Sequence, residues 1–289
     1  MLEQFYNWLL QLASSLASLL KILMRSSFNL KMLKSDAQSC VVLGNGPSIK
    51  QTLQSHQDFL NNHTLICVNR FPETEAFLQF QPEHFVLVAK NWKDNVSESS
   101  KQSSIELYDS VINRTTWDMH VHLPAEAKKC KWLMDRFQQN KHLTIALYND
   151  TPVEGLIKWN HFFFRKGWGL PRPHNVIIPS LMIAINAGFK EIFLVGADHS
   201  WLEGLRVNEK NEALLFQKHF YDEDTAKLDY MRKLGKRPRK LHEILEKFML
   251  AFKAYFVIND YAKTKGAKIW NATPKSFVDA FERKNLKDI

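Results

Sequence analysis

Apolar and polar positions follow two periods along most of the chain. Short apolar runs, which predict buried strands, stand at 40–46, 64–71, 84–91, 143–150, 191–198 and 267–274. Between them, apolar residues recur every three or four positions, which predicts helices at 48–60, 125–139, 176–188, 241–266 and 275–283. Strands that alternate with helices favour an α/β fold with a doubly wound, mainly parallel sheet of the Rossmann-like kind.

Residues 1–25 also have helical periodicity, and they precede the alternating strands and helices. Apolar residues such as Leu9 and Leu16 recur along one face, and polar residues such as Gln11 and Ser18 fall between them. The pattern predicts an amphipathic helix rather than a continuous apolar span. An acidic residue at position 3 argues against a signal peptide, which would carry basic residues there.

Three interpretations of this helix remain open. It packs on the protein's own core or on another subunit, or it crosses a membrane, or it lies at a membrane surface. In the last case Trp8 would lie near the headgroups, and a set of basic residues would face anionic lipid. That set is Lys21, Arg25, Lys31 and Lys34.

The segment 199–242 breaks the regular pattern, because it is polar, charged and poor in periodic apolar residues. Such a stretch inside an α/β domain predicts a lid or an interaction loop, and we call it the lid segment. The expected organisation is an N-terminal helix at 1–35, which could associate with a membrane, followed by one α/β domain at 36–289 that contains the lid segment.

Composition narrows the class of partner. A chain of 289 residues with 45% hydrophobic residues can bury one large core. A net charge of +9 favours an anionic partner, such as a nucleotide, an acidic sugar, nucleic acid or anionic lipid. Three cysteines without metal-ligand spacing indicate a reducing compartment, with Cys40 and Cys67 as buried thiols. His120 and His122 alternate like residues on one strand face, and we interpret them as structural.

Polar residues stand where the predicted strands end, and ligands of open α/β sheets bind beyond the carboxyl ends of the strands. Amides, hydroxyls and a guanidinium suit a base, a ribose and phosphate oxygens. The residues at these ends are Gly44, Asn45, Gly46, Pro47, Ser48, Asn69, Arg70, Lys90, Asn91, Gly196, Asp198, Asn271 and Thr273.

The turn "GNGPS" at 44–48 has two possible roles. Gly44 and Gly46 would let a ligand approach the backbone closely, Ser48 could cap the next helix, and the exposed N–H groups of that helix would favour an anion. Position 49 is Ile, so the third glycine of a dinucleotide fingerprint is missing. The turn is therefore either a phosphate site or a packing corner, and the polar ends of the other strands favour a ligand site.

Five stretches together resemble a known family. They are "VVLGNGPSI", "CVNRF", "VAKNW", "AINAGFKEIFLVGAD" and "NATPKSFVDAF", within about residues 40–285. They are similar to the bacterial sialyltransferases of glycosyltransferase family 42 and to the related MptE-like (hydroxymethylpterin pyrophosphokinase-like) domain. The resemblance implies a CMP-sugar donor held by the α/β domain.

The same resemblance implies roles for individual residues. Asn45 and Ser48 would contact phosphate and ribose, Asn69 and Asn91 would position the CMP-sugar, Asn175 would lie near the pocket, and the turn at 271–274 would flank the cytidine. Family 42 enzymes use a histidine of the lid as general base and two lid tyrosines at the leaving phosphate. In the lid segment His219 is the candidate base and Tyr221 the nearest tyrosine.

The family's aromatic pattern after "VGAD" is replaced by "HSWLEG" at 199–204. Assistance to the leaving group therefore stays open between Tyr221, His199 and Arg206. The identity of the sugar also stays open between sialic acid, a Kdo-like sugar and a pseudaminic-type sugar.

The leading hypothesis is a bacterial glycosyltransferase in the cytoplasm, associated peripherally with the inner face of an anionic membrane. It would transfer an acidic sugar from a CMP-sugar to a glycan or lipid-linked glycan of lipopolysaccharide or capsule, without a required cofactor or metal. The family resemblance also implies self-association into a homo-oligomer.

Two other classes remain. An MptE-like pyrophosphokinase would transfer pyrophosphate from ATP with Mg²⁺, but few paired carboxylates stand at the strand ends. A non-catalytic nucleotide-binding or nucleic-acid-binding protein would use the basic stretch 231–243. That stretch has no interleaved aromatic residues, which argues against nucleic acid.

Overall fold

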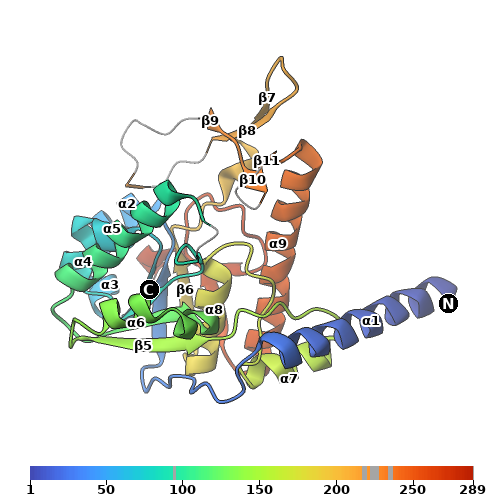
Figure 1. The fold of residues 1–289 in the computed structure, drawn as a ribbon, viewed down its shortest axis with the longest axis horizontal. Coiled ribbons are helices and arrows are strands. Elements are labelled where there is room, and N and C mark those ends of the chain that lie inside the picture. The colour runs from blue at the N-terminus through green and yellow to red at the C-terminus, as the bar shows by residue number, and fades with distance from the viewer. Residues whose placement is uncertain (94–95, 217–219, 222–227, 234–236, 289) are drawn as a thin grey trace.

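The centre of the molecule is a parallel sheet in the strand order β13-β12-β6-β1-β2-β3-β4-β5 (Figure 1). The computed structural model describes residues 1–93, 96–216, 220–221, 228–233 and 237–288. The strands are β1 Ser39–Leu43, β2 Thr64–Val68, β3 His84–Val86, β4 Met119–Pro124, β5 Leu143–Tyr148, β6 Glu191–Val195, β12 Lys268–Asn271 and β13 Glu282–Arg283. The chain builds the sheet outward from β1 to β5 and then returns to β6 on the other side of β1. The predicted fold class is confirmed.

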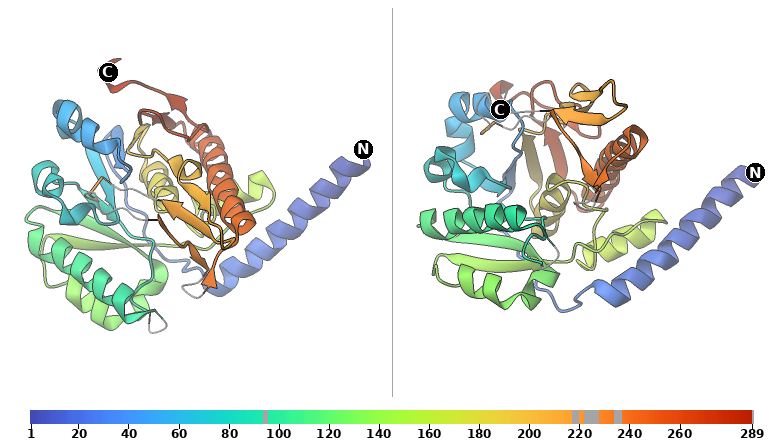
Figure 2. Two further views of the ribbon diagram at one scale, coloured as in Figure 1. Left: turned by 90° about the horizontal axis from the view of Figure 1, so that it is seen from above. Right: turned by 45° about the horizontal axis from the view of Figure 1, so that its top comes forward.

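Helices cover both faces of the sheet (Figure 2). One face carries α2 Ile49–Ser55, α3 Gln57–Asn61, α4 Glu75–Phe80, α5 Glu98–Arg114 and α6 Lys131–Phe137. The other carries α8 Ile177–Ala187 and α9 Leu241–Thr264, and α7 Ile157–Arg165 and the end of α1 Leu2–Arg25 pack beside them. Strand β1 shows why two cores form, because Cys40 and Val42 face α8 whereas Val41 and Leu43 face the other layer.

The lid segment contains strands of its own, which the polar sequence did not predict. β7 Leu205–Val207, β8 Ala213–Phe216 and β9 Leu228–Asp229 form an antiparallel sheet, and β10 Arg232–Lys233 pairs with β11 Arg237–Pro238. Ala213 and Leu215 bury themselves against Ile244 and Phe248 of α9. This small core attaches the lid segment to the start of α9.

The predicted helix at 275–283 is wrong. Short turns replace it, and they lead into β13. Tertiary hydrogen bonds occupy the backbone there: the Phe277 N–H donates to the Asp198 carbonyl at 2.9 Å, and Asn259 Nδ2 donates to the Ala280 carbonyl at 2.6 Å. A backbone group that already has a tertiary partner is not available for a helical ladder.

Other elements also differ from the prediction, which did not include α4, α5 or α7. The helix at 48–60 is broken at His56 into α2 and α3, and the helix at 125–139 is divided into the 3₁₀ turn η2 Ala125–Lys129 and α6. Strand β4 was missed because its histidines hide its apolar character. His122 is buried and His120 is half-buried, and both lie beside His84: His84 Nδ1 lies 3.0 Å from His122 Nε2, and the His84 and His120 rings stack. The prediction that Cys40 and Cys67 are buried is confirmed.

The ends of β1 and β6 come unusually close together. The Gly44 N–H donates to the Val195 carbonyl and the Gly46 N–H to the Gly196 carbonyl, both at 2.8 Å. A Cβ on Gly44 would lie 2.4 Å from the Gly196 oxygen, and a Cβ on Gly196 would lie 2.5 Å from the Gly44 oxygen. Gly196 also has a φ of +63°. Glycine at both positions is therefore a requirement of the sheet itself.

The substitution Gly196→Ala should destabilise the protein more than Gly266→Ala. Gly266 has nearly the same φ, +62°, but a Cβ there would meet only a lysine Nζ at 3.9 Å. We expect Gly266→Ala to lower the free energy of unfolding by about 1 kcal/mol, because alanine is strained in the left-handed conformation. Gly196→Ala should lower it by about 2 to 3 kcal/mol more, because its Cβ would also collide with the Gly44 backbone. Urea unfolding measures both, and equal losses would contradict the close approach.

Candidate functional site

A cleft of about 280 Å³ opens at the carboxyl ends of β1, β2 and β6, where the strand order reverses. This is the position at which open α/β sheets bind ligands. We call it the cleft. Its lining consists of Gly44, Asn45, Gly46, Pro47, Val68, Asn69, Val88, Asn175, Val176, Ile177, Gly196, Asp198, His199, Ser200, Trp201 and Phe216.

Asn45 lies in the wall of the cleft and has a free hydrogen-bond acceptor. Its side chain is 6% exposed, and Nδ2 donates to the Val68 carbonyl at 3.0 Å. Among the described residues, nothing donates to its Oδ1, which is buried. Buried polar atoms nearly always have a partner, so an orphaned oxygen here marks a place where a ligand N–H or O–H can bind.

Asn69 follows β2 and takes a left-handed conformation, with a φ of +51°. Asparagine tolerates this conformation better than most side chains. The turn places the side chain in the lining of the cleft beside Asn45. The two amides that the sequence analysis assigned to one site therefore line the same cleft in the structure.

Asn175, Tyr255 and His199 form a hydrogen-bonded network at the side of the cleft. Asn175 Oδ1 accepts from the Ile177 N–H at 3.0 Å, at the start of α8, and Nδ2 donates to the Tyr255 hydroxyl at 2.9 Å. The Tyr255 hydroxyl lies 2.6 Å from His199 Nε2. A hydroxyl that accepts from Asn175 can donate to His199, which leaves Nδ1 as the ring atom able to serve a ligand.

His199 is a neutral residue at physiological pH. Its ring stacks on Trp201 with the centroids 4.1 Å apart, and Phe252 and Tyr255 enclose it further. This burial lowers the pKa of His199 to about 3. His199 can therefore give a leaving phosphate a hydrogen bond but no positive charge.

Asp198 and Ser48 bind each other, which corrects the expected role of the turn. Ser48 Oγ donates to Asp198 Oδ2 at 2.8 Å, and the Ser48 N–H donates to Oδ1 at 3.2 Å. Ser48 stands at the N-cap position of α2, but its side chain makes no cap bond. The N–H groups of Gly44 and Gly46 also have backbone partners, and the Ile49 N–H at the start of α2 donates to the Gly46 carbonyl at 3.1 Å, so an anion site at this helix start stays a prediction. Burial raises the pKa of Asp198.

The remaining predicted residues lie outside the lining of the cleft. Arg70 forms an ion pair with Glu73 and bonds Ser103, and Asn91 Nδ2 donates to Ser104 at 2.9 Å. Asn271 Nδ2 donates to the Val278 carbonyl at 2.8 Å. The Thr273 hydroxyl lies 3.1 Å from both the Ala197 N–H and the Leu194 carbonyl. These four residues serve the protein's own structure in the state described.

Besides the residues that line the cleft, the lid segment contacts Asn45 through Phe220, which is not itself in the lining. The Phe220 N–H donates to the Asn45 carbonyl at 3.1 Å, and its ring packs on Phe71. Tyr221 follows it, with its ring 5.2 Å from that of Phe220. The predicted base, His219, lies outside the described residues. Arg206 donates to the carbonyls of its own turn, at Glu203 and Leu205.

Sequence reasoning missed the aromatic wall of the cleft. Trp201 and Phe216 line it, and Trp201 also stacks on Phe248 of α9. In the sequence, only Trp201, two positions after His199, could have indicated this wall. Phe216 gave no signal, because it is the β7–β8 pairing that brings it to the cleft. A flat aromatic wall suits a planar base or a sugar face.

A second, larger depression of about 780 Å³ lies at the carboxyl ends of β3, β4 and β5. We call it the basic groove, because its lining includes the cations Arg25, Lys90, Lys93, Lys129 and Arg172 against the acids Glu126 and Asp150. Lys90 lies 2.9 Å from Glu126 and 2.8 Å from Asp150. Hydrogen bonds from Lys93 and Lys90 lower the pKa of Glu126 to about 2.

Within the described part of the chain, no group of three or more His, Cys, Asp and Glu side chains is arranged to hold a metal ion.

Comparisons with known proteins bear on the fold. No family model and no curated protein matches the chain. Among solved structures, the MAf glycosyltransferase from Magnetospirillum magneticum AMB-1 is similar, with a TM-score of 0.51 and 11% sequence identity. The match covers 92% of this chain and 36% of the MAf chain. At this identity the likeness shows a shared fold. The resemblance to family 42 and to the MptE-like domain stays a prediction.

The buried histidines should make the protein less stable in mild acid. Burial lowers the pKa of His84 to about 4 and that of His199 to about 3. In the unfolded chain both bind protons near pH 6.5, so below that pH the unfolded state holds more protons than the native state. The free energy of unfolding should therefore fall between pH 7 and 5, by up to about 1.4 kcal/mol per pH unit for each histidine.

Urea unfolding at several pH values measures this slope. His199→Asn should make it shallower, because asparagine tolerates the left-handed backbone but does not titrate. A stability that stays constant from pH 7 to 5 would contradict the neutral state of these histidines.

Proposed function

We propose that this protein is a glycosyltransferase that takes an acidic sugar from a CMP-sugar and passes it to a glycan acceptor, with the nucleotide in the cleft. The observation that carries the proposal is the orphaned Asn45 Oδ1 in a cleft at the switch point of the sheet. A ribose hydroxyl or the amino group of cytosine can supply the missing donor. A glycosyltransferase of the same fold, MAf, supports the reaction class.

The charge of the cleft favours a nucleoside monophosphate over a diphosphate. Among the described residues of its lining, none is Lys or Arg, and Asp198 contributes a carboxylate. A diphosphate in such a site would need a cation to offset its charge, as Mg²⁺ does in many nucleotide sites. The phosphodiester of a CMP-sugar carries a single negative charge, which amide and imidazole hydrogen bonds can accommodate, and the carboxylate of the acidic sugar would need the cations of the neighbouring basic groove.

The acceptor fits best in the basic groove. Lys90 stands after β3, and Asn175 of the cleft follows closely on Arg172 and Pro173 of the groove. An acceptor with phosphate or carboxylate groups would meet Arg25, Lys129 and Arg172 there. Its nucleophilic hydroxyl would then point along the sheet edge toward the cleft.

The chemical step needs a base, and His219 is the residue we propose. The support for this proposal is that its chain neighbour Phe220 is bonded to Asn45, a residue that lines the cleft. The acceptor hydroxyl would give its proton to the imidazole while its oxygen bonds to the anomeric carbon. The bond from that carbon to the phosphate oxygen would break, and CMP would leave with the electron pair. Tyr221 would then hydrogen-bond the departing phosphate.

Thermal stabilisation by nucleotides tests the site. CMP should raise the melting temperature without metal, and CDP, UDP, GDP, NAD and ATP should act less or not at all. Asn69→Gly should weaken CMP binding about tenfold, since it removes one side-chain hydrogen bond of about 1.4 kcal/mol while keeping the left-handed backbone.

The matched control is Asn211→Gly, a second left-handed asparagine with a φ of +57°, which lies between β7 and β8. It should leave CMP binding unchanged. A shift that requires ATP and Mg²⁺ would favour the pyrophosphokinase instead. No shift with any nucleotide would overturn the proposal.

The proposed base has a separate test. His219→Ala should lower kcat for sugar transfer by about 10²- to 10⁴-fold, and CMP should still stabilise the variant as it does the wild type. His242→Ala, at an exposed position of the same lid segment, is the control and should keep its activity. A His219→Ala enzyme with normal kcat would remove this residue from the mechanism.

A further inference from the structure

Helix α1 packs on the domain with its polar side. Ser18 Oγ lies 2.9 Å from both the carbonyl and the N–H of Glu154, and Ser15 Oγ accepts from the Leu156 N–H at 2.8 Å. The buried residues of the helix are Ser15, Ser18 and Ile22. Gly155 allows this contact, because a Cβ there would lie 2.3 Å from Ser15 Oγ.

The apolar side of α1 consequently faces outward. Its exposed large side chains are Leu2, Phe5, Tyr6, Trp8, Leu9, Leu10, Leu16, Leu20, Leu23 and Met24. Residues 4–20 include no Asp, Glu, Lys or Arg, and by length and composition the helix could cross a membrane. The first half of α1 extends beyond the rest of the molecule (Figure 1). Proteins in water rarely expose an apolar surface of this length, so we expect a partner or a membrane to cover it.

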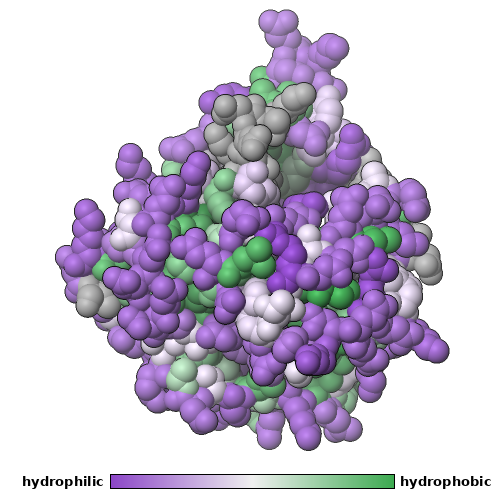
Figure 3. All heavy atoms as spheres, turned by 90° about the vertical axis from the view of Figure 1, so that its left-hand side faces the viewer, coloured by the Kyte–Doolittle hydropathy of each residue, from purple (hydrophilic) through white to green (hydrophobic). Residues whose placement is uncertain are grey.

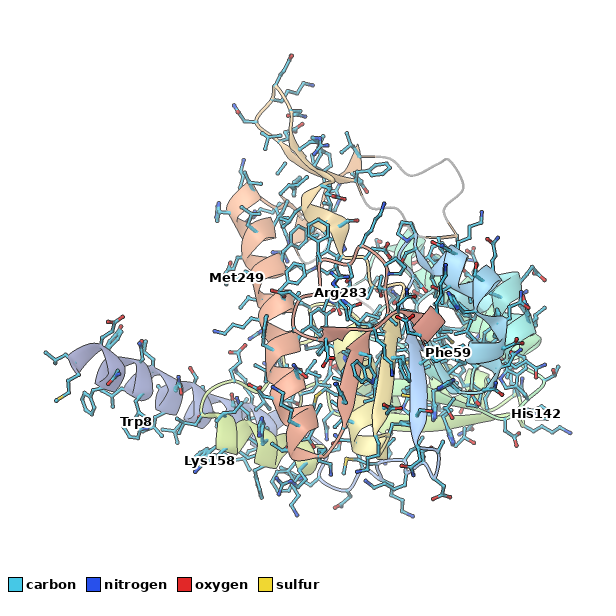
Figure 4. All side chains as sticks on the ribbon, turned by 180° about the vertical axis from the view of Figure 1, so that it is seen from behind. Trp8, Phe59, His142, Lys158, Met249 and Arg283 are labelled. Carbon is cyan, nitrogen blue, oxygen red and sulfur yellow. The ribbon has the colours of Figure 1, made fainter. Side chains whose placement is uncertain are left out.

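Helix α7 continues this outward surface. It begins immediately after Leu156, beside Ser15 of α1, and it exposes Ile157, Trp159 and Phe162. Figure 4 shows Trp8 of α1 and Lys158 of α7 on the same outward side of the molecule. We call α1 and α7 together the two-helix surface. The opposite face of the molecule is largely hydrophilic, with only scattered apolar residues (Figure 3).

Basic residues border the two-helix surface. They are Lys21 and Arg25 on α1, and Lys158, Arg165 and Lys166 on and just after α7. A second copy of the chain would bring the same positive charges against this border, whereas anionic lipid headgroups would neutralise them. The charge therefore favours a bilayer over a dimer.

We propose that the two-helix surface docks on an anionic lipid bilayer, with α1 lying in the plane of the membrane. A spanning helix would place Gln4, Asn7 and Gln11 in hydrocarbon, where unpaired amides are costly. An in-plane helix keeps this polar stripe on the headgroup side, in line with Ser15 and Ser18, and inserts the leucines.

The inference stands independently of the proposed function, but it has a consequence for it. Met24 and Arg25, at the end of α1, also line the basic groove. A docked α1 would hold the mouth of this groove at the headgroups, where a lipid-linked acceptor with anionic groups could enter from the membrane.

Vesicle sedimentation with the full chain tests the surface. The protein should sediment with vesicles of phosphatidylcholine and phosphatidylglycerol, less with phosphatidylcholine alone, and less at high salt. The double substitution Leu16→Gln and Leu20→Gln should weaken binding at least about tenfold. The matched control, Leu245→Gln with Met249→Gln, alters two apolar residues of α9 with exposures of 41% and 57%, close to the 53% and 59% of the α1 pair.

The orientation of α1 has its own measurement. A Gln4→Cys variant in which Cys130 is Ser should react with a membrane-impermeant maleimide on sealed vesicles, because an in-plane helix keeps the polar stripe at the headgroups on the side of the domain. Labelling only after detergent would mean that α1 spans the bilayer, and it would overturn the in-plane arrangement. Equal vesicle binding by the wild type and the α1 double variant would overturn the surface itself. If the wild type forms a dimer that the α1 double variant does not form, and the wild type does not bind vesicles, then a second copy of the chain covers the surface.

Discussion

The backbone contact between Gly44 and Gly196 is the constraint on which the site depends. It joins the ends of two central strands without any side chain between them. Because the strands meet so closely, Asp198 reaches across to Ser48 and fixes the following turn. Asn45 is held at this turn, with its Nδ2 bonded to the end of the next strand and its buried Oδ1 without a partner among the described residues. A larger residue at either glycine would separate these parts.

This construction gives the cleft an unusual electrostatic character. The glycine-rich turn looks like a phosphate site, but its N–H groups are used to join the strands. The groups that remain for a ligand are neutral: the amides of Asn45 and Asn69 and the uncharged ring of His199. Positive charge is gathered instead in the basic groove beside it. Along a single sheet edge, the described residues thus form a cleft that holds the Asp198 carboxylate and no cation, and beside it a groove rich in cations.

Helix α1 reverses the usual relation between an amphipathic helix and its domain. Its serines satisfy the backbone of the loop at 154–156, and its leucines remain outside. Short hydroxyl side chains allow the helix to approach that loop closely, and Gly155 gives it room. The fold therefore uses polar contacts to attach the helix and leaves the apolar face of the helix exposed.

The sequence by itself determined the periodic elements: the α/β class, α1, and the strands that lead to the cleft, because buried strands and amphipathic helices have patterns that few other structures share. It also placed Asn45, Asn69 and Asp198 near one another, since the carboxyl ends of parallel strands meet at one edge, whereas Asn175 was expected there only from the family resemblance. Only the tertiary structure decided which polar atoms remained free. Ser48 and Thr273 look as available as Asn45 in the sequence, but partners 150 and 76 residues away occupy them. The same holds for the missed strand β4 and the absent helix at 275–283, where distant partners outweighed local preference.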